Sequence, residues 1–375
     1  MRVLQLVTRR QHRGAEVFAA HLSNALAERG HEVYFVGLYP PPPEPLAPAA
    51  AKTADLQAEP GGRGVSLARL SQLASCVRSL EPDVVQANGS DTLKYSVLVK
   101  RLQRGRWPLV YRTISVASYW LRYPGQRAWG RWLARGVDHV VAVSDESRAD
   151  FARTYSVPAS RISTIRRGVH LPGRDGAAEA RENLRALADL PPDAEILVHI
   201  GSFTAEKNHL WLLEAFKQIR RRRERSHLLL LGDGPLRETV AQAVAGGELE
   251  QAVHLLGSRA DADELVAGAD LLLLGSTVEG IPGVILEAAA RGVPSVSTAV
   301  GGVHEAVRDG ETGMLVPSGD TAGFVSAVVE LLDDPRRRQQ LGMAAHEFVR
   351  QHHDMKVVVG AFEGLYQELA RAART

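Results

Sequence analysis

Short, continuous apolar runs alternate with longer segments of helical periodicity along almost the whole chain. Such runs are typical of parallel strands that are buried on both faces, and helices supply the crossovers between these strands. The predicted strands are 3–7, 32–38, 84–87, 109–113, 139–143, 196–200, 228–231, 253–255, 271–274 and 295–297. The predicted helices include 15–29, 210–223, 236–245, 262–267, 284–291, 321–332 and 335–350, with a tail helix to about 370. The alternation predicts an α/β fold.

The alternation occurs twice, which predicts two Rossmann-like domains. A chain of 375 residues is long enough for two cores, at about 150 residues per domain. A polar, Ala- and Arg-rich segment at 172–193 separates the halves. We therefore expect an N-terminal domain over 1–172, a C-terminal domain over 173–351 and a closing helix over 352–375. The proline-rich stretch 39–64 has no periodicity and predicts a surface loop.

Composition excludes several classes of function. Hydrophobic residues make up 45% of the chain and the formal net charge is +2, so nothing electrostatic favours a nucleic-acid partner. The single cysteine, Cys76, excludes an internal disulfide and fits a reducing compartment. No apolar run approaches the ~18 residues of a membrane span, and the N-terminal run is too short for a signal peptide. These features predict a cytoplasmic protein.

The most specific motif is Glu279-Gly280-Ile281-Pro282-Gly283-Val284-Ile285-Leu286-Glu287, which follows a predicted strand and enters a predicted helix. The first backbone N–H groups of a helix, here those of Gly283 and Val284, have no partner within the helix and can bind a phosphate. Glu279 could accept hydrogen bonds from sugar hydroxyls, and Glu287 from a ribose diol. The alternative interpretation is a capped helix with solvated acids.

Two further segments join a predicted strand to a predicted helix. Gly201-Ser202-Phe203-Thr204-Ala205-Glu206-Lys207-Asn208 carries a lysine that could neutralise a diphosphate leaving group. A loop lysine is most often only solvated, so the prediction of a role for Lys207 depends on the presence of the two glutamates. In Arg13-Gly14-Ala15-Glu16, the glycine would let the backbone approach a ligand at the start of a helix, although a tight turn explains it equally well.

Other motifs are spread over both halves of the chain. The first half contains Gly30-His31-Glu32-Val33, Pro82-Asp83-Val84-Val85 and Ala142-Val143-Ser144. The second half contains Gly232-Asp233-Gly234-Pro235, Ser276 before Glu279-Gly280, Glu287-Ala288, and Gly301-Gly302, Glu305, Asp309-Gly310, Thr312-Gly313 and Leu315-Val316-Pro317. Together with Arg13–Glu16, these motifs resemble the retaining family 4 glycosyltransferases with the GT-B fold. The resemblance covers nearly the whole chain and is most specific over 196–320.

The resemblance implies two Rossmann-like domains that face a cleft, with a nucleotide-sugar on the second domain and the acceptor mainly on residues 1–170. Lys207 would bind the diphosphate with Gly14 and the amides of Gly283 and Val284, while Glu279 would contact the donor sugar and Glu287 the ribose. The remaining donor-site residues would be Gly201, Ser202, Gly232, Arg259 (near the base), Ser276 and Gly280. A hexosyl group would be transferred with retention, without a metal ion or a protein nucleophile. The last helix would return to the first domain.

The chain departs from the family pattern at two places. Ser202 stands where many members have arginine, so we expect Arg166 or Arg167 to compensate at the diphosphate. Histidines that are frequent in the family are replaced by Asn88 and by Ile114-Ser115. Acceptor-side candidates therefore lie at the carboxyl ends of predicted strands or just beyond them, where open α/β sheets bind ligands. These candidates are Asn88, Arg112, Ser115, Ser144 and Arg167.

The expected partners are a UDP- or GDP-linked sugar donor and an acceptor that is a sugar, a lipid-linked molecule or a small molecule. We expect no nucleic acid, no metal ion and no further cofactor, and the oligomeric state stays open. Residues 119–135 interleave three tryptophans with four arginines. This pattern fits either a peripheral contact with the inner face of the membrane or a helix that packs its apolar side on the sheet.

Three other functions stay open. Non-hydrolysing nucleotide-sugar epimerases share the two-domain fold, although the spaced glutamates with Lys207 argue against this function. A dinucleotide-dependent oxidoreductase is disfavoured because Gln11-His12-Arg13-Gly14 replaces the G-x-G-x-x-G that would follow the first strand. A non-catalytic nucleotide-sugar-binding protein would account for Ser202 and for the missing histidines.

Overall fold

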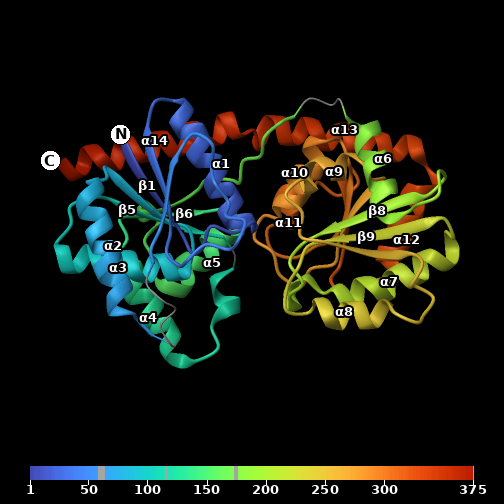
Figure 1. The fold of residues 1–375 in the computed structure, drawn as a ribbon, viewed down its shortest axis with the longest axis horizontal. Coiled ribbons are helices and arrows are strands. Elements are labelled where there is room, and N and C mark those ends of the chain that lie inside the picture. Colours follow the sequence, from blue (N-terminus) through green and yellow to red (C-terminus); the bar gives the residue numbers. More distant parts are fainter. Residues whose placement is uncertain (58–63, 115, 173–175, 375) are drawn as a thin grey trace. The chain divides into compact units, whose positions relative to one another are not determined.

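The structure, a computed structural model, describes residues 1–57, 64–114, 116–172 and 176–374. The chain divides into two compact units. One unit joins Met1–Gly168 with Met355–Thr375, and the other is Val169–Asp354. Each unit is built around one parallel sheet with helices on both faces, which confirms the prediction of two Rossmann-like domains (Figure 1).

The N-terminal unit contains a seven-stranded parallel sheet in the order β3-β2-β1-β4-β5-β6-β7. The strands are β1 (Arg2–Val7), β2 (Glu32–Gly37), β3 (Lys52–Asp55), β4 (Val84–Ala87), β5 (Leu109–Thr113), β6 (His139–Ala142) and β7 (Ile162–Thr164). The helices are α1 (Gly14–Glu28), α2 (Leu67–Leu80), α3 (Ser90–Gln103), α4 (Pro124–Arg135), α5 (Asp145–Tyr155) and α14 (Met355–Arg374). Two short 3-10 turns, η1 (Ala117–Trp120) and η2 (Ala159–Arg161), complete it.

Alternation along the strands assigns the helices of this unit to opposite faces. Val3, Val84 and Val110 pack with residues of α1 and α14, whereas Leu4 and Val85 pack with residues of α2, α3, α4 and α5. Successive side chains of a strand point to opposite faces, so a strand that is apolar throughout buries both. This arrangement explains why the central strands appear in the sequence as continuous apolar runs.

The two edge strands of this sheet were not predicted. β3 lies inside the stretch 39–64, for which the prediction of a loop is wrong at Lys52–Asp55; residues 58–63 of that stretch lie outside the described residues. β3 pairs with β2 through backbone hydrogen bonds, and three of its four residues are exposed. A short edge strand needs no apolar run, so neither β3 nor the three-residue β7 leaves a hydrophobic pattern.

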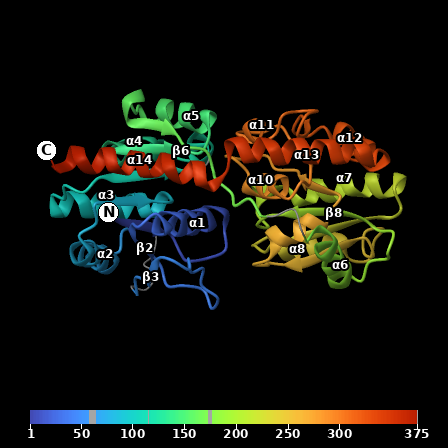
Figure 2. The same cartoon turned by 90° about the horizontal axis from the view of Figure 1, so that it is seen from above.

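The last helix, α14, belongs to the N-terminal unit and lies beside α1 (Figure 2). The rings of Phe18 on α1 and Phe362 on α14 lie 6.0 Å apart. Beneath it, the hydroxyl of Tyr366 donates to Oε1 of Gln86 (2.5 Å) and accepts from Nε2 of Gln5 (3.1 Å). Gln5 and Gln86 face each other on paired strands. The tail is thus fixed by a buried polar network as well as by apolar contact.

The C-terminal unit contains a six-stranded parallel sheet in the order β10-β9-β8-β11-β12-β13. The strands are β8 (Glu195–Ile200), β9 (Ser226–Leu231), β10 (Val253–Gly257), β11 (Leu271–Leu274), β12 (Ser295–Thr298) and β13 (Gly313–Val316). On one face lie α7 (His209–Arg222), α8 (Arg237–Val244) and α12 (Thr321–Asp333). On the other lie α6 (Ala177–Ala188), α9 (Ala262–Leu265), α10 (Gly283–Ala290), α11 (Val303–Ala306) and α13 (Pro335–His352).

The segment 172–193, predicted as the junction, contains α6, a helix of the C-terminal unit. The contacts divide the chain after Gly168 and after Asp354, within four residues of the boundaries expected at 172 and 351. The guanidinium of Arg181 on α6 donates to the carbonyls of Gly268 and Ala194 and to Asp270. Only Ala180 and Leu184 of α6 are buried, and two apolar positions in a polar helix give little sequence signal.

We predict that Tyr366→Phe destabilises the N-terminal unit. The substitution leaves the buried amides of Gln5 and Gln86 each short of one hydrogen bond, which costs about 1–3 kcal/mol. Urea unfolding followed by circular dichroism measures this loss. The control is Tyr34→Phe, which removes a hydroxyl bonded to the partly exposed Glu32. Equal stability of the two variants would contradict the role of the network.

Candidate active site

Strand order locates the candidate site of the C-terminal unit. From β8 the chain runs through β9 and β10 on one side and then returns to place β11 on the other side of β8. Open α/β sheets bind ligands outside the carboxyl ends of the strands at such a reversal. The loops that leave β8 and β11 are 201–208 and 275–282, the two segments with the predicted lysine and glutamate.

These loops bring Lys207 and Glu279 together. Nζ of Lys207 lies 2.5 Å from Oε1 of Glu279, and Oγ of Ser276 donates to the same oxygen at 2.7 Å. Glu279 is 8% exposed, Ser276 is fully buried, and the amide of Thr277 donates to the carbonyl of Glu206 at 2.8 Å to join the loops. The lysine and the glutamate therefore bind each other, a contact that the sequence did not predict.

Glycines fix the backbone of both loops. At Gly232 a Cβ atom would lie 1.9 Å from the carbonyl oxygen of Gly201, and at Gly301 it would lie 1.9 Å from the carbonyl oxygen of Glu279. Both glycines have positive φ, which side chains disfavour. Gly232, predicted to bind the donor, thus supports Gly201. The motif glycine Gly301 supports Glu279 in the same way.

The helix α10 begins at Gly283, as the motif predicts. Its N-cap residue, Pro282, makes no side-chain hydrogen bond to the first turn. The N-cap side chain therefore does not occupy the amides that an anion would bind. Val284 and Glu287 are half-buried on this helix, and Gly280 is buried in the loop before it. The amides of Gly283 and Val284 therefore lie at the start of α10, next to the loop that carries Glu279.

Two other predicted donor-site residues, Arg259 and Ser202, bond to residues that are close to them in sequence. Arg259 follows β10 and makes a two-point ion pair with Asp261, with both donor–acceptor distances at 2.8 Å. Its guanidinium is therefore engaged by Asp261. Ser202 is half-buried in the β8 loop, where its carbonyl accepts from the amide of Thr204 at 2.8 Å.

Two buried histidines without a predicted role, His199 and His209, lie under the β8 loop. Nδ1 of His199 contacts the carbonyl of Leu273 at 2.9 Å, and its Nε2 lies 3.2 Å from where a Cβ of Gly201 would be. The ring of His209 stacks on Phe203 with centroids 4.2 Å apart. Burial lowers the pKa of His199 to about 3 and that of His209 to about 4, and the charge of Lys207 contributes to both shifts. Both imidazoles are therefore neutral near pH 7.

In the N-terminal unit, Gly14 is the first residue of α1, and its carbonyl accepts from Nη1 of Arg167 at 3.1 Å. Arg112 is 2% exposed near the carboxyl end of β5, with the centre of its guanidinium 3.8 Å from the ring centroid of Phe18. Arg166, the other arginine expected to compensate for Ser202, is exposed and lies 3.4 Å from a carboxylate oxygen of Asp145. The structure thus brings Gly14, Arg112 and Arg167 to one place, around the start of α1.

The remaining acceptor-side candidates are not gathered there. Asn88 is buried, accepts from Nε2 of Gln86 at 2.9 Å and donates to Oε1 of Gln5 at 3.0 Å, so its amide serves the network under α14. Ser144 is buried as the N-cap of α5, where its hydroxyl accepts from the amide of Ser147 at 3.0 Å. Ser115 lies outside the described residues.

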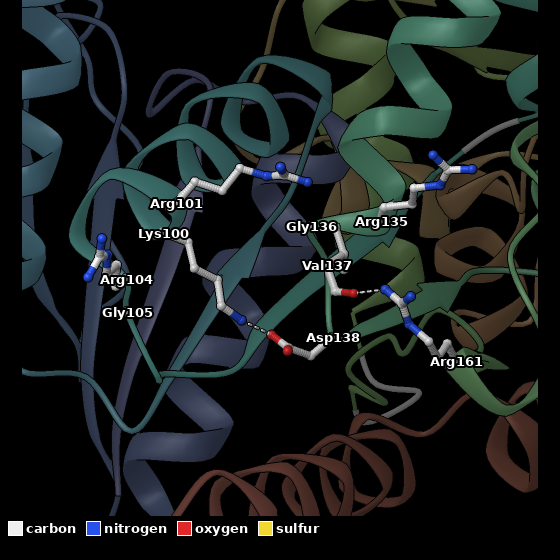
Figure 3. Close-up of a pocket in the computed structure, with 9 residues that line it drawn as sticks. All are labelled: Lys100, Arg101, Arg104, Gly105, Arg135, Gly136, Val137, Asp138 and Arg161. Carbon is white, nitrogen blue, oxygen red and sulfur yellow. Dashed lines mark hydrogen bonds and ion pairs between the residues drawn. The ribbon is translucent and has the colours of Figure 1, made fainter.

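A basic hollow of about 590 Å³ lies at the opposite edge of the same sheet (Figure 3). It is lined by Lys100, Arg101, Arg104, Gly105, Arg135, Gly136, Val137, Asp138 and Arg161. Lys100 pairs with Asp138, and Arg161 donates to the carbonyl of Val137. Asp138 and Arg161 immediately precede β6 and β7, so the hollow lies at the amino ends of the strands, away from the edge where such sheets bind substrates.

The tryptophan-rich segment 119–135 is only partly buried. Trp129 stacks on Trp132 with ring centroids 4.9 Å apart, and Trp132 lies under the guanidinium of Arg101. Tyr119, Trp120, Tyr123 and Trp129 are exposed. Within the described ranges, no helix is both long and apolar enough to cross a membrane. In the same ranges, no group of three or more His, Cys, Asp or Glu side chains could hold a metal ion.

The buried histidine pair predicts acid sensitivity. Between about pH 6.5 and pH 4 an unfolded histidine binds a proton that folded His199 and His209 do not, so stability is lost as the pH falls. Each histidine contributes a slope of about 1.4 kcal/mol per pH unit over this interval. Unfolding midpoints at pH 7.5, 6 and 5 should fall less steeply for His209→Phe than for the wild type. A control, His12→Asn at an exposed position, should keep the wild-type slope. Identical slopes in all three proteins would contradict the prediction.

Sequence comparisons agree with this arrangement. The family described as Glycosyltransferase Family 4 matches residues 12–171, and the family described as Glycosyl transferases group 1 matches residues 194–334. One relative is the N-acetyl-α-D-glucosaminyl L-malate synthase of Bacillus anthracis, 36% identical over 47% of this chain and 46% of its own length. Another is the GDP-mannose-dependent α-(1-6)-phosphatidylinositol monomannoside mannosyltransferase of Mycolicibacterium smegmatis, 32% identical over 61% of this chain and 62% of its own length. The chain thus spans about half to three fifths of these relatives.

Solved structures resemble the chain over its whole length. The Anabaena protein Alr3699/HepE, solved with UDP and glucose, superposes with a TM-score of 0.82 at 22% identity and covers 98% of this chain and 100% of its own. The sucrose-phosphate synthase of Thermosynechococcus elongatus gives the same TM-score and identity, with 99% of each chain covered. These similarities show the fold, and the two family matches together span more than half of the sequence. The chain therefore belongs to the family 4-like glycosyltransferases with the GT-B fold.

Proposed function

We propose that this protein is a retaining glycosyltransferase that moves a hexosyl group from a nucleotide-sugar to an acceptor hydroxyl. The observation that carries the proposal is the meeting of Lys207, Glu279 and the start of α10 at the point where the strand order of the C-terminal sheet reverses. A cation, a buried carboxylate and a helix N-terminus at one place suit a ligand that combines a diphosphate with hydroxyl groups.

In this proposal Lys207 changes its partners when the donor binds. An ammonium group has three N–H donors, so it can bind a phosphate oxygen and still contact Glu279. Ser276 donates to the oxygen that binds Lys207, which keeps the carboxylate oriented. The other oxygen of Glu279 would then accept a hydrogen bond from a hydroxyl of the donor sugar. Glu287, one helical turn into α10, would accept hydrogen bonds from the ribose.

The transfer would proceed on one face of the sugar. The bond between the anomeric carbon and the phosphate oxygen breaks, the acceptor oxygen forms its bond on the same face, and the departing phosphate takes the hydroxyl proton. The negative charge that develops on the diphosphate would be stabilised by Lys207 and by the amides of Gly283 and Val284. Because these groups supply the positive charge, we propose that the reaction needs no metal ion and tolerates EDTA.

The relatives suggest which donors to test first. Alr3699/HepE was solved with UDP and glucose, and the Mycolicibacterium relative is GDP-mannose-dependent. We propose a UDP- or GDP-linked hexose as the donor of this chain. The first acceptors to test are L-malate, named for the Bacillus relative, and a phosphatidylinositol mannoside, named for the Mycolicibacterium relative.

We predict that Lys207→Ala reduces transfer about 10²–10³-fold, because removal of one group that stabilises transition-state charge costs about this much. Sugar transfer from UDP- and GDP-hexoses is measured by mass spectrometry of the products, and UDP affinity by calorimetry. A matched control, Lys217→Ala on α7, removes a lysine whose Nζ lies 3.9 Å from Glu248 and should leave both quantities unchanged. Wild-type turnover in Lys207→Ala would contradict the proposed site.

Incubation with the donor alone tests the other open functions. A glycosyltransferase should show no change in the donor sugar beyond slow hydrolysis. An epimerised sugar would instead indicate an epimerase. Tight binding of UDP without transfer to any acceptor and without hydrolysis would indicate a non-catalytic binding protein.

A further inference from the structure

Arg112 is a buried cation without a counter-ion. It is 2% exposed, and neither its Nε nor its Nη1 atom has a hydrogen-bond partner within the part of the chain that the structure describes. No ion pair involves it in that part either. Transfer of an unpaired charge from water into a protein costs several kcal/mol unless another interaction offsets it. The ring of Phe18, under the guanidinium, offsets only part of this cost.

The charge that acts on Arg112 is that of another cation, Arg167. This second arginine is 8% exposed, and its Nη1 donates to the carbonyl of Gly14 at the start of α1. Burial of Arg112, with a smaller contribution from the charge of Arg167, lowers the pKa of Arg112 to about 9, so it still carries its proton near pH 7. Two like charges thus converge on the first turns of one helix.

The groups that surround Arg112 do not neutralise it. Phe18 on α1 is apolar, and Tyr366 on α14 stays protonated because burial raises the pKa of its phenol. The Tyr366 hydroxyl is already bonded to Gln5 and Gln86. Helix α1 adds positive potential at its N-terminus, where the N-cap, Arg13, makes no capping hydrogen bond. The first turn also carries a carboxyl group, Glu16, which accepts from Nε2 of Gln11 at 3.3 Å and whose pKa is raised by burial.

Gly14 leaves the start of α1 uncovered beside Arg167. It is exposed, and a Cβ atom there would lie 3.1 Å from Nη1 of Arg167. A side chain at position 14 would therefore crowd this guanidinium. The absence of a Cβ atom keeps the backbone at the start of the helix open.

We propose that Arg112 and Arg167, together with the start of α1, form a binding site for an anionic group, a phosphate or a carboxylate, of the acceptor. An anion there would supply the missing counter-charge of Arg112 and accept charge-assisted hydrogen bonds from Arg167. The inference rests on the proposed function in one respect: the anion would belong to the acceptor, which the proposal assigns to the N-terminal unit. A phosphate and a carboxylate both present oxygens that bind arginine.

The test is a titration with inorganic phosphate while the protein is saturated with UDP, so that phosphate cannot occupy the donor site. Thermal shift reports the binding, because a ligand that binds only the folded state raises the unfolding midpoint. The variants are Arg112→Met and Arg167→Gln. The matched control is Arg69→Met, which removes another buried arginine, one that lies 4.2 Å from the ring centroid of Tyr39.

We expect the apparent dissociation constant for phosphate to rise about tenfold or more in both variants and to stay unchanged in the control. UDP affinity should stay unchanged in both variants, because the acceptor's anion does not belong to the donor. A fall of about tenfold in UDP affinity would overturn the inference, because the arginines would then serve the donor diphosphate. Arg167→Gln, which lies nearer to solvent, decides the matter if Arg112→Met does not fold.

A wild-type response to phosphate in both variants would overturn the inference. It would also be overturned if phosphate did not shift the wild-type midpoint. Failure of the proposed function gives a different result, namely binding of neither UDP nor GDP to the wild type. In that case the phosphate titration is run without nucleotide and still reports on the two arginines.

Discussion

The ion pair between Lys207 and Glu279 is the interaction on which the candidate site depends. It joins the loops that leave β8 and β11, the two neighbouring strands between which the chain reverses direction across the sheet. Without the glutamate, the lysine would be a flexible surface cation, and without the lysine the glutamate would be an uncompensated buried charge. Each residue therefore sets the conformation and charge of the other before any ligand arrives.

The backbone around this pair is constrained by close contacts that only glycine permits. Gly232 and Gly301 lie against the carbonyls of Gly201 and Glu279, and His199 packs beneath the first of these loops. A rigid support reduces the reorganisation needed when charge develops on a leaving group, which is the condition for efficient electrostatic stabilisation. The motif glycines thus act through the backbone that holds the two charged residues.

The sequence was sufficient for the central strands and for the two charged loops, because buried parallel strands and helix starts leave strong local patterns. It missed β3, β7 and β13, since short strands toward the sheet edges are held by backbone hydrogen bonds that any side chain allows. It also could not show that Lys207 and Glu279, 72 residues apart, bind each other. The role expected for Asn88 depended on the same kind of long-range information, because its partner Gln5 lies 83 residues away in the sequence. Arg259 instead pairs with Asp261, two residues further along the chain.

Binding of the diphosphate by the two charged loops is tested most directly by hydrogen exchange of the whole chain with and without UDP. UDP is expected to slow exchange chiefly at the amides of 201–208 and 279–287, because a bound diphosphate would order both loops and the start of α10. Protection confined to other segments, such as the basic hollow at the amino ends of β6 and β7, would contradict it.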